Sequence, residues 1–117
     1  MDPSRVTQRT QGPPIYIVSG GTGASAELLV RTVLAQFRNV DVPLVIKTHV
    51  LTLEQVEAAV DEIADANGTI VHTMVNGECR RHLVDLAAAK GVYSVDLTSI
   101  LLDHLESELN QEPLGQP

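Results

Sequence analysis

The stretch that most constrains this chain is residues 15–27, with the sequence IYIVSGGTGASAE. A β-branched run leads into a glycine-rich segment and then into helical periodicity, which predicts a buried strand, a tight turn and the first turn of a helix. In α/β folds such a turn presents backbone N–H groups and a helix N-terminus to an anion at the carboxyl edge of the sheet. The stretch therefore predicts an α/β fold with an anion site, without specifying the anion.

The rest of the chain alternates between strand and helix patterns. Strands are predicted at residues 15–18, 44–48, 69–75 and 92–95, and an amphipathic helix follows each of them. Alternation of this kind gives parallel strands joined by right-handed crossovers. We therefore expect an α/β fold, a three-layer sandwich with a four-stranded parallel sheet that is Rossmann-like or flavodoxin-like. With the strand order 2-1-3-4, a ligand crevice opens between the first and third strands.

The sequence also predicts where the helices are capped and which of their faces turn toward the sheet. Thr52 and Gln55 form a capping-box pattern at the start of the second helix, and Asp96 is placed to cap the last helix. The first and last helices each carry a row of apolar residues at helical spacing, which we expect to face the sheet: Ala26, Leu29, Val30, Val33, Leu34 and Phe37 in the first, and Ile100, Leu101, Leu105 and Leu109 in the last.

The chain divides into three parts by composition. Residues 1–12 are polar and without period, which is typical of a disordered arm. Residues 13–110 are expected to form one α/β domain. Residues 111–117 contain two prolines and a glycine and are interpreted as a linker or a truncated end.

Composition excludes several classes of partner. Eight basic residues stand against fifteen acidic ones, with a net charge of -7, which is the wrong balance for neutralising nucleic-acid phosphates. Apolar runs stay well short of the roughly 20 residues of a membrane span, and the start of the chain lacks the layout of a signal peptide. Cys79 is the only cysteine, so no internal disulfide forms. We expect a cytoplasmic protein that binds neither nucleic acid nor membrane.

The glycine turn departs from two known nucleotide-binding patterns. A Walker A loop requires G-x-x-x-x-G-K-[ST], and no lysine lies near Gly23, so a triphosphate is not gripped in that way. Residues 21–26 match a loose dinucleotide pattern, G-x-G-x-x-A. However, Thr48 and His49 stand at the end of the second strand, where that fold has a ribose-binding acid.

Two further fold families share part of the pattern. Residues 19–27 resemble a flavin phosphate loop, but no loop offers an aromatic ring to stack on a flavin, because Tyr16 and Phe37 are expected in the core. A receiver domain would carry paired acids after the first strand, where Ser19 and Gly20 stand instead. A flavodoxin-like phosphate-binding module stays open as an alternative.

The candidate binding residues lie where the predicted strands end. We expect a phosphate or nucleotide to contact the glycine turn and the end of the third strand, with Thr48, His49 and Asp96 as further groups at that edge. No catalytic residue is assigned, and the scattered histidines predict no metal site. The candidate set is Ser19, Gly20, Gly21, Thr22, Gly23, Ser25, Thr73, Asn76 and Arg81.

Each candidate also has an interpretation without a ligand. The glycines could serve only a tight strand-to-helix connection. Arg80 and Arg81 could be a solvated helix face, since cations near a helix N-terminus are mildly unfavourable. Cys79 at a helix start could be reactive, although we expect a packed and inert thiol.

Several short motifs resemble one known family, the regulatory proteins of pyruvate, phosphate dikinase and phosphoenolpyruvate synthase. They are SGGTGASAE at residues 19–27, LAQF at 34–37, TMV at 73–75 and GVYSVDL at 91–97. The order and separation of these motifs agree over almost all of residues 15–109. The family loop usually begins Ser-Asp-Gly-Thr-Gly, and Gly20 stands in place of its acid.

The resemblance implies a function for the full-length protein. Members are bifunctional: they use ADP to phosphorylate a threonine beside the catalytic histidine of the target dikinase or synthase, and they use inorganic phosphate to remove that group with release of pyrophosphate. The family's P-loop lies in the C-terminal half, so this chain resembles the N-terminal domain. We expect it to be inactive as a kinase by itself and to bind phosphate, ADP or the target enzyme.

Two other interpretations assign the chain to a different class of protein. The chain could be a stand-alone module whose glycine turn holds phosphate or a nucleotide. It could also be an interaction domain without a ligand, forming a homodimer through its leucine-rich last helix.

Overall fold

Four parallel strands form the central sheet of the computed structural model, which describes residues 9–117. They are β2 (Ile15–Val18), β4 (Leu44–Lys47), β5 (Thr69–His72) and β6 (Ser94–Asp96). The order across the sheet is β4-β2-β5-β6, which corresponds to the order 2-1-3-4 that the ligand crevice required, and each neighbouring pair is parallel. The predicted α/β sandwich on a parallel sheet is confirmed.

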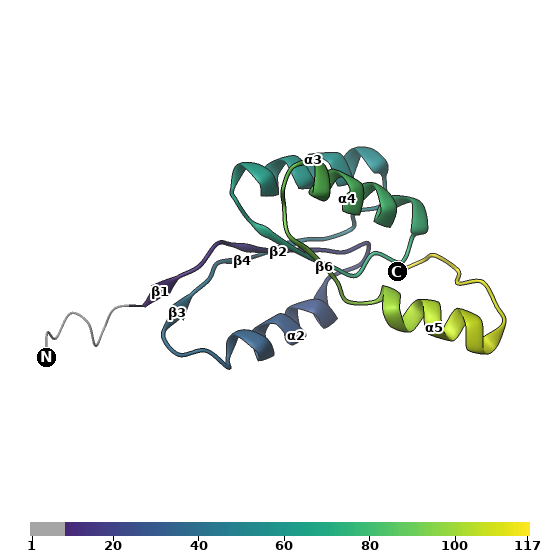
Figure 1. The fold of residues 1–117 in the computed structure, drawn as a ribbon, viewed down its shortest axis with the longest axis horizontal. Coiled ribbons are helices and arrows are strands. Elements are labelled where there is room, and N and C mark those ends of the chain that lie inside the picture. The colour runs from purple at the N-terminus through teal and green to yellow at the C-terminus, as the bar shows by residue number, and fades with distance from the viewer. Residues whose placement is uncertain (1–8) are drawn as a thin grey trace, which may run out of the picture.

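Helices cover both faces of the sheet (Figure 1). Helices α3 (Leu53–Asp65) and α4 (Gly77–Ala89) lie on one face, and α2 (Ala24–Leu34) lies on the other. The chain moves across the sheet in one direction from β2 to β4 and in the opposite direction from β4 through β5 to β6. Right-handed crossovers therefore place α2 on the opposite side from α3 and α4.

The main hydrophobic core lies between the sheet and helices α3 and α4. In α3, Val56, Ala59, Val60 and Ile63 are buried at the spacing of one helical face. They pack with Ile70 from β5 and with apolar residues of the other strands and of α4. Most of the buried apolar surface therefore lies on this face of the molecule.

Local side-chain caps define where the helices begin. The Thr52 side chain accepts from the Gln55 backbone N–H at 3.1 Å, and Gln55 Oε1 accepts from the Thr52 N–H at 3.1 Å, so the predicted capping box is present. Asn76 Oδ1 accepts from the Cys79 N–H at the start of α4. Asp96 Oδ1 accepts from the Ser99 N–H at 2.9 Å and thus caps α5 (Ser99–Leu109), as expected.

A smaller apolar cluster lies on the face covered by α2, and here the predicted inward row is partly wrong. Ala26 and Val30 are buried, whereas Leu29, Val33 and Phe37 are exposed. Phe37 is 61% exposed because α2 ends at Leu34, so the later residue no longer lies on the helical face. The expectation that Phe37 belongs to the core is therefore wrong.

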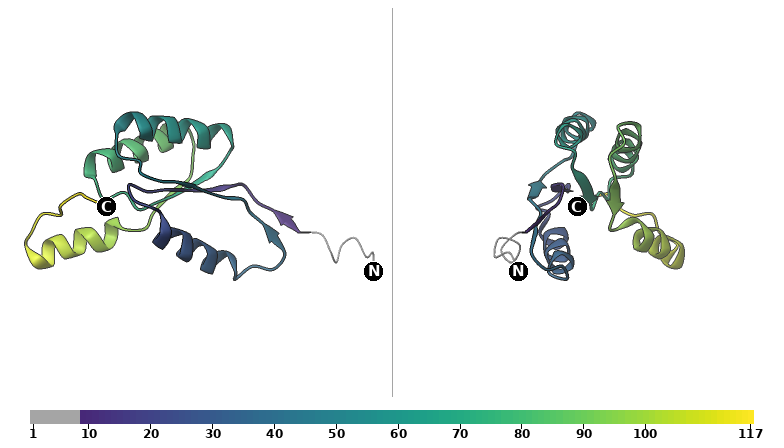
Figure 2. Two further views of the ribbon diagram at one scale, coloured as in Figure 1. Left: turned by 180° about the vertical axis from the view of Figure 1, so that it is seen from behind. Right: turned by 60° about the vertical axis from the view of Figure 1, so that its left-hand side comes forward.

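Helix α5 also differs from its prediction. It contains no buried residue, and the apolar side chains predicted to face the sheet are exposed, Ile100 by 87% and Leu101 by 63%. The helix leaves the end of β6 and runs away from the sheet, as Figure 2 shows from two further sides. Its leucines therefore face solvent and the C-terminal tail rather than the sheet.

A short parallel ribbon precedes the sheet. Strand β1 (Thr10–Gln11) pairs with β3 (Val40–Asp41). Prolines at positions 13, 14 and 43 lack an N–H, which interrupts the ladder between this ribbon and the main sheet. Two residues of the arm expected to be disordered thus form a strand, and residues 1–8 of that arm lie outside the described residues.

Residues 111–117 have no regular structure and fold back from α5 toward the glycine turn (Figure 1). A Cβ added to Gly20 would lie 3.3 Å from Pro117 Cγ, and one added to Gly115 would lie 3.9 Å from Asn76 Cα. The interpretation of this segment as a linker or truncated end stays a prediction. Within the described part of the chain, the helices are too short or too polar to cross a bilayer.

Candidate functional site

The glycine turn lies at the carboxyl end of β2, between neighbours β4 and β5. Backbone hydrogen bonds tie it to the chain after β4: Val50 N–H donates to Ser19 O at 2.9 Å, and His49 N–H donates to Gly21 O at 2.9 Å. These bonds hold the turn at the point where the chain reverses its direction across the sheet. That point is where open α/β sheets bind ligands.

Two residues give the turn its shape. Ser19 is buried, and its hydroxyl accepts from the Gly21 N–H at 3.0 Å. Gly23 has φ 76°, a left-handed conformation, and is the N-cap of α2 without a side-chain cap. The first amides of a helix have no partner within the helix. At the start of α2 they therefore remain donors, with only a long 3.4 Å contact from Ala24 N–H to Thr22 Oγ1.

The residues that carry these amides line a cavity of about 300 Å³ between the glycine turn, the end of β5 and the start of α5. Its polar lining consists of hydroxyls and backbone groups, and no acidic side chain lines it. Neutral donors and a helix N-terminus suit a compact anion such as phosphate. The lining residues are Ser19, Gly21, Thr22, Gly23, Ala24, Ser25, Ala26, Thr73, Val75, Thr98 and Pro117.

Most of the predicted site residues come together at this cavity: Ser19, Gly21, Thr22, Gly23, Ser25 and Thr73 all line it.

Three predicted residues lie elsewhere. Gly20 belongs to the same turn but faces Pro117 and Leu51. The Asn76 carboxamide is used to cap α4, and Arg81 is exposed and does not line the cavity.

Five lining residues are outside the predicted set: Ala24, Ala26, Val75, Thr98 and Pro117. Thr98 could have been found, because it follows the fourth strand and carboxyl ends of parallel strands share one edge. Val75 ends the predicted third strand (residues 69–75), whose end was expected to contact the ligand. No sequence signal indicates Pro117, since its position depends on how the tail folds back.

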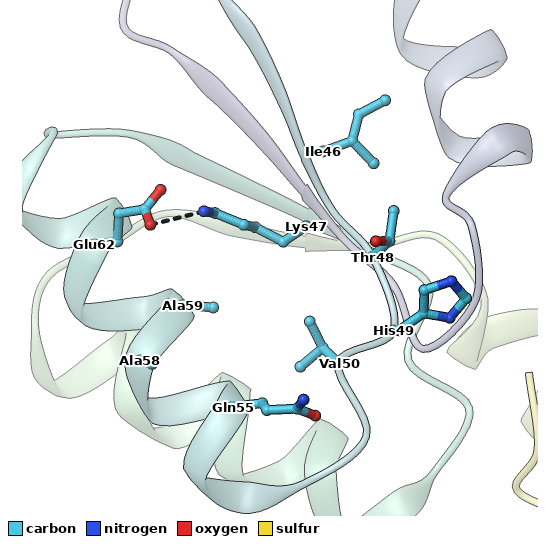
Figure 3. Close-up of a pocket in the computed structure, with 9 residues that line it drawn as sticks. All are labelled: Ile46, Lys47, Thr48, His49, Val50, Gln55, Ala58, Ala59 and Glu62. Atoms are coloured by element: carbon cyan, nitrogen blue, oxygen red, sulfur yellow. Dashed lines mark hydrogen bonds and ion pairs between the residues drawn. The ribbon is translucent and has the colours of Figure 1, made fainter.

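A second cavity, of about 370 Å³, lies between β4 and α3 (Figure 3). Thr48 and His49 line this cavity and not the one at the glycine turn. Its charged groups are paired: Lys47 Nζ lies 2.7 Å from Glu62 Oε1, the contact drawn in Figure 3. Gln55 is used in the capping box. Because its lysine is paired and a carboxylate lines it, this larger cavity is the weaker candidate for an anion.

A histidine and a carboxylate lie side by side where β5 and β6 end, next to the cavity. His72 is fully buried, its Nδ1 accepts from the Met74 N–H at 3.4 Å, and its Nε2 is 3.8 Å from Asp96 Oδ2. Within residues 9–117, Nε2 is the buried side-chain polar atom without a hydrogen-bond partner. Burial lowers the pKa of His72, Asp96 opposes this effect, and Arg80 adds to it.

The carboxylate of this pair remains ionised. Burial by itself raises the pKa of Asp96, but hydrogen bonds from Ser99 and Thr98 and the neighbouring His72 outweigh it, so the pKa lies below its ordinary value. The Ser99 hydroxyl donates to Asp96 Oδ2. At neutral pH the pair is therefore a neutral imidazole beside a carboxylate that caps α5.

Cys79 is buried at the start of α4, and its Sγ lies 3.6 Å from Leu51 O. Burial, with a smaller contribution from Glu78, raises the pKa of its thiol, which opposes reactivity. This matches the expectation of a packed and inert cysteine.

Fold and cavity together define a doubly wound α/β domain with a glycine-rich turn at its switch point. Comparison with known proteins gives the family. A family model described as kinase/pyrophosphorylase matches residues 15–117. The chain belongs to the kinase/pyrophosphorylase family, as its motifs indicated.

Similar proteins carry the name pyruvate, phosphate dikinase regulatory protein. One from Chloroflexus aurantiacus is 45% identical over 105 residues, which covers 90% of this chain and 38% of the relative. One from Desulfotalea psychrophila is 36% identical over 103 residues, covering 88% of this chain and 36% of the relative. One from Listeria monocytogenes is 39% identical over 105 residues, again 90% and 38%. The chain thus spans less than two fifths of the length of these relatives.

Proposed function

We propose that this domain binds phosphate, or the phosphate group of a nucleotide such as ADP, at the glycine turn, and that it takes part in regulating pyruvate, phosphate dikinase or phosphoenolpyruvate synthase. The observation that carries the binding proposal is the uncapped N-terminus of α2, which opens on a cavity lined by hydroxyls and free of acidic side chains. The names of the relatives support the regulatory role.

In this proposal the domain does not transfer a phosphoryl group by itself. Phosphoryl transfer needs cationic groups around the transferred phosphate. The chain contains no G-x-x-x-x-G-K-[ST] pattern, and Lys47 and Lys90 are its only lysines. Both are engaged in ion pairs, with Glu62 and Asp61. The ADP-dependent kinase and phosphate-dependent phosphorylase activities belong to a longer family protein, in which this domain supplies an accessory anion site or part of the surface that contacts the target.

Calorimetric titration of the chain with phosphate, ADP, AMP and FMN tests the binding proposal. We expect heat with phosphate and with the adenine nucleotides, and FMN, which also carries a phosphate, should bind no more tightly than AMP, because no aromatic side chain lines the cavity to hold its ring. Binding of FMN much more tightly than AMP would favour the flavodoxin-like alternative instead. The absence of heat with all four ligands would contradict the proposed anion site.

The location of the site is tested with a pair of matched variants on α2. Ser25→Asp places a carboxylate at the cavity, where we expect anion affinity to fall by at least about tenfold through like-charge repulsion. Thr32→Asp adds the same charge to an exposed position of the same helix and should bind as the wild type does. An acid in the first turn of a helix is stabilising, so unfolding would not explain the loss in Ser25→Asp. Equal anion affinity of the two variants would show that the anion binds elsewhere in the domain.

The absence of transfer by the domain is tested by incubating it with ADP and purified pyruvate, phosphate dikinase. Phosphothreonine should stay at background, while a full-length relative under the same conditions provides the positive control. Phosphorylation by the domain would overturn the assignment of activity to the longer protein.

A further inference from the structure

The C-terminal tail lies across the edge of the sheet where the anion cavity opens. Residues 112–117, the strap, run back from the end of α5 to the glycine turn (Figure 1). Pro117 lines the anion cavity, and a Cβ added to Gly20 would lie 3.5 Å from Pro117 Cβ. A Cβ added to Gly115 would lie 3.9 Å from Val75 O. The strap therefore contacts both the turn after β2 and the segment after β5.

A further cavity, of about 230 Å³, lies beside the strap. The strap residues Glu112 and Gly115 line it, together with Arg80 of α4. Val75 lines both this cavity and the anion cavity, so the two meet after the end of β5. Because Gly115 borders one cavity and Pro117 borders the other, the strap passes between them and separates Arg80 from the anion cavity.

Arg80 is a cation close to the anion cavity. It takes part in none of the ion pairs found among residues 9–117. Its charge contributes to the lowered pKa of His72, the last residue of β5, and the next residue, Thr73, lines the anion cavity. A guanidinium offers a phosphate a full positive charge and paired N–H donors. Arg80 would therefore supply the charge that the neutral lining of the anion cavity lacks.

The strap opposes an anion at this edge in two ways. Pro117 has no N–H, and its carbonyl only accepts, so an anion beside it gains no hydrogen bond from it. Glu112 adds a carboxylate to the cavity of Arg80, where Asp103 and Glu106 of α5 already lie. Removal of the strap would take away one of these acids and open the path from Arg80 to the glycine turn.

The strap is held by few interactions. It has no regular structure, and Leu114 within it is 86% exposed. Among residues 9–117, no backbone hydrogen bond joins residues 112–117 to the rest of the chain. Segments with exposed side chains and without backbone hydrogen bonds open at a low cost in free energy. A ligand that binds better to the open form can therefore displace the strap.

We propose that residues 112–117 are an autoinhibitory strap, which closes the anion cavity and separates it from Arg80, so that an anion binds most tightly when the strap is displaced and Arg80 reaches it. This inference rests on the anion site proposed above. It adds a regulatory segment and a cationic residue to that site.

Displacement of the strap is tested with a matched pair of variants. Gly115 has φ 71°, which a β-branched side chain does not adopt without strain, so Gly115→Val should release the strap. Gln116→Val places the same side chain at the next position, which is exposed and has no positive φ. Titrated with inorganic phosphate in a calorimeter, Gly115→Val should bind at least about fivefold more tightly than the wild type, and Gln116→Val within about twofold of it. Circular dichroism checks that both variants fold.

The role of Arg80 is tested by a double-mutant cycle with the same phosphate titration. In the wild-type background, where the strap is closed, Arg80→Gln should change the affinity by less than about twofold. In Gly115→Val it should abolish most of the gain, because the residue acts only after the strap leaves. Arg38→Gln removes the same charge from an exposed position outside both cavities and measures the general effect of lost charge. Equal effects of Arg80→Gln in both backgrounds would contradict its role.

A reversible lock tests the closed state. In the double variant Gly20→Cys with Pro117→Cys, the two Cβ atoms would lie 3.5 Å apart, which a disulfide can bridge. Oxidised glutathione forms the bond and fixes the strap, and dithiothreitol releases it. Cys79 is buried and stays out of the exchange. The oxidised protein should bind phosphate at least about fivefold more weakly than the same protein after reduction.

The outcomes separate the strap from the anion site itself. If Ser25→Asp binds phosphate more weakly than the wild type, but Gly115→Val binds as the wild type does and the lock has no effect, the strap is wrong and the anion site stands. Tighter binding by the oxidised protein would show that the strap helps to hold the anion, which also overturns the inference. If none of these proteins binds phosphate, the anion site is wrong, and the strap with it.

Discussion

At the scale of single residues, Gly23 shows how one backbone angle shapes the candidate site. Its φ of 76° turns the chain from β2 into α2 and leaves the helix without a side-chain cap. A Cβ at this position would also lie 2.8 Å from Ile46 Cγ2, closer than packed carbon atoms approach. The glycine therefore serves both the turn and the packing of the sheet.

We predict that Gly23→Ala destabilises the domain by about 3 kcal/mol, from the left-handed backbone and the steric overlap combined. Gly21→Ala is the control, because a Cβ there would lie 3.6 Å from Pro117, an ordinary contact, and its φ is not positive. It should cost less than about 1 kcal/mol. Urea denaturation of both variants measures the difference, and equal losses would contradict the prediction.

The buried His72 and its neighbour Asp96 make stability depend on pH. Burial lowers the pKa of His72 in the folded state below its ordinary value of 6.5. At a pH between the folded-state pKa and 6.5, His72 is therefore protonated in the unfolded chain but neutral in the folded protein. Stability should therefore fall as the pH drops below 6.5. The lowered pKa of Asp96 adds a second loss as the pH falls below about 3.8 toward the folded-state pKa.

The histidine contribution can be isolated with His72→Asn, whose side-chain oxygen can accept from the Met74 N–H as Nδ1 does. The wild type should lose up to about 1.4 kcal/mol per pH unit relative to this variant in the window below pH 6.5. Urea unfolding at a series of pH values measures this gap. A constant difference between the two proteins would show that His72 is not responsible.

At the scale of elements, the ends of α3 and α4 follow from short-range chemistry. Thr52 and Gln55 satisfy each other's backbone donors at 3.1 Å, and Asn76 accepts from the amide three residues later. These bonds involve residues at most three positions apart, which is why the sequence predicted where α3 begins and that Asp96 caps α5.

We predict that Thr52→Ala costs about 1 kcal/mol, because it removes the acceptor for the Gln55 N–H at the start of α3. Thr52→Ser keeps a hydroxyl in the same place and should stay within about 0.5 kcal/mol of the wild type. Thermal or urea unfolding distinguishes them. If both variants lost the same stability, the methyl group rather than the cap would be the stabilising part.

At the scale of the whole molecule, the core is one-sided. The α3 and α4 face holds the larger buried cluster, while the α2 face leaves a groove and α5 leaves its leucines exposed. Mutational sensitivity should therefore follow position and not side-chain size.

A pair of deletions tests this asymmetry. Ile63→Ala on α3 removes a fully buried side chain and should cost about 3 kcal/mol through lost burial and the cavity left behind. Tyr93→Ala removes a larger side chain that is 72% exposed and should cost less than about 1 kcal/mol. Chemical denaturation gives both values. A greater loss for Tyr93→Ala would mean that the core lies elsewhere.

The sequence by itself determined the alternation of elements, the parallel sheet, and the position of the glycine turn after the first strand of that sheet, whereas the strand order entered the sequence analysis only as a condition. Each depends on local periodicity, turn chemistry and the handedness of crossovers, which hold within a few tens of residues. It also indicated most of the cavity lining, because the carboxyl ends of neighbouring parallel strands meet at one edge.

Only the tertiary structure decided which apolar rows are buried. Helical spacing is the same for Ile63 of α3 and Leu105 of α5, yet one is fully buried and the other is exposed. Periodicity states that a helix has an apolar side, but whether another layer covers that side depends on where the chain goes next. For the same reason the sequence could not place Pro117 at the glycine turn or Arg81 away from it, since both positions follow from how whole segments fold against one another.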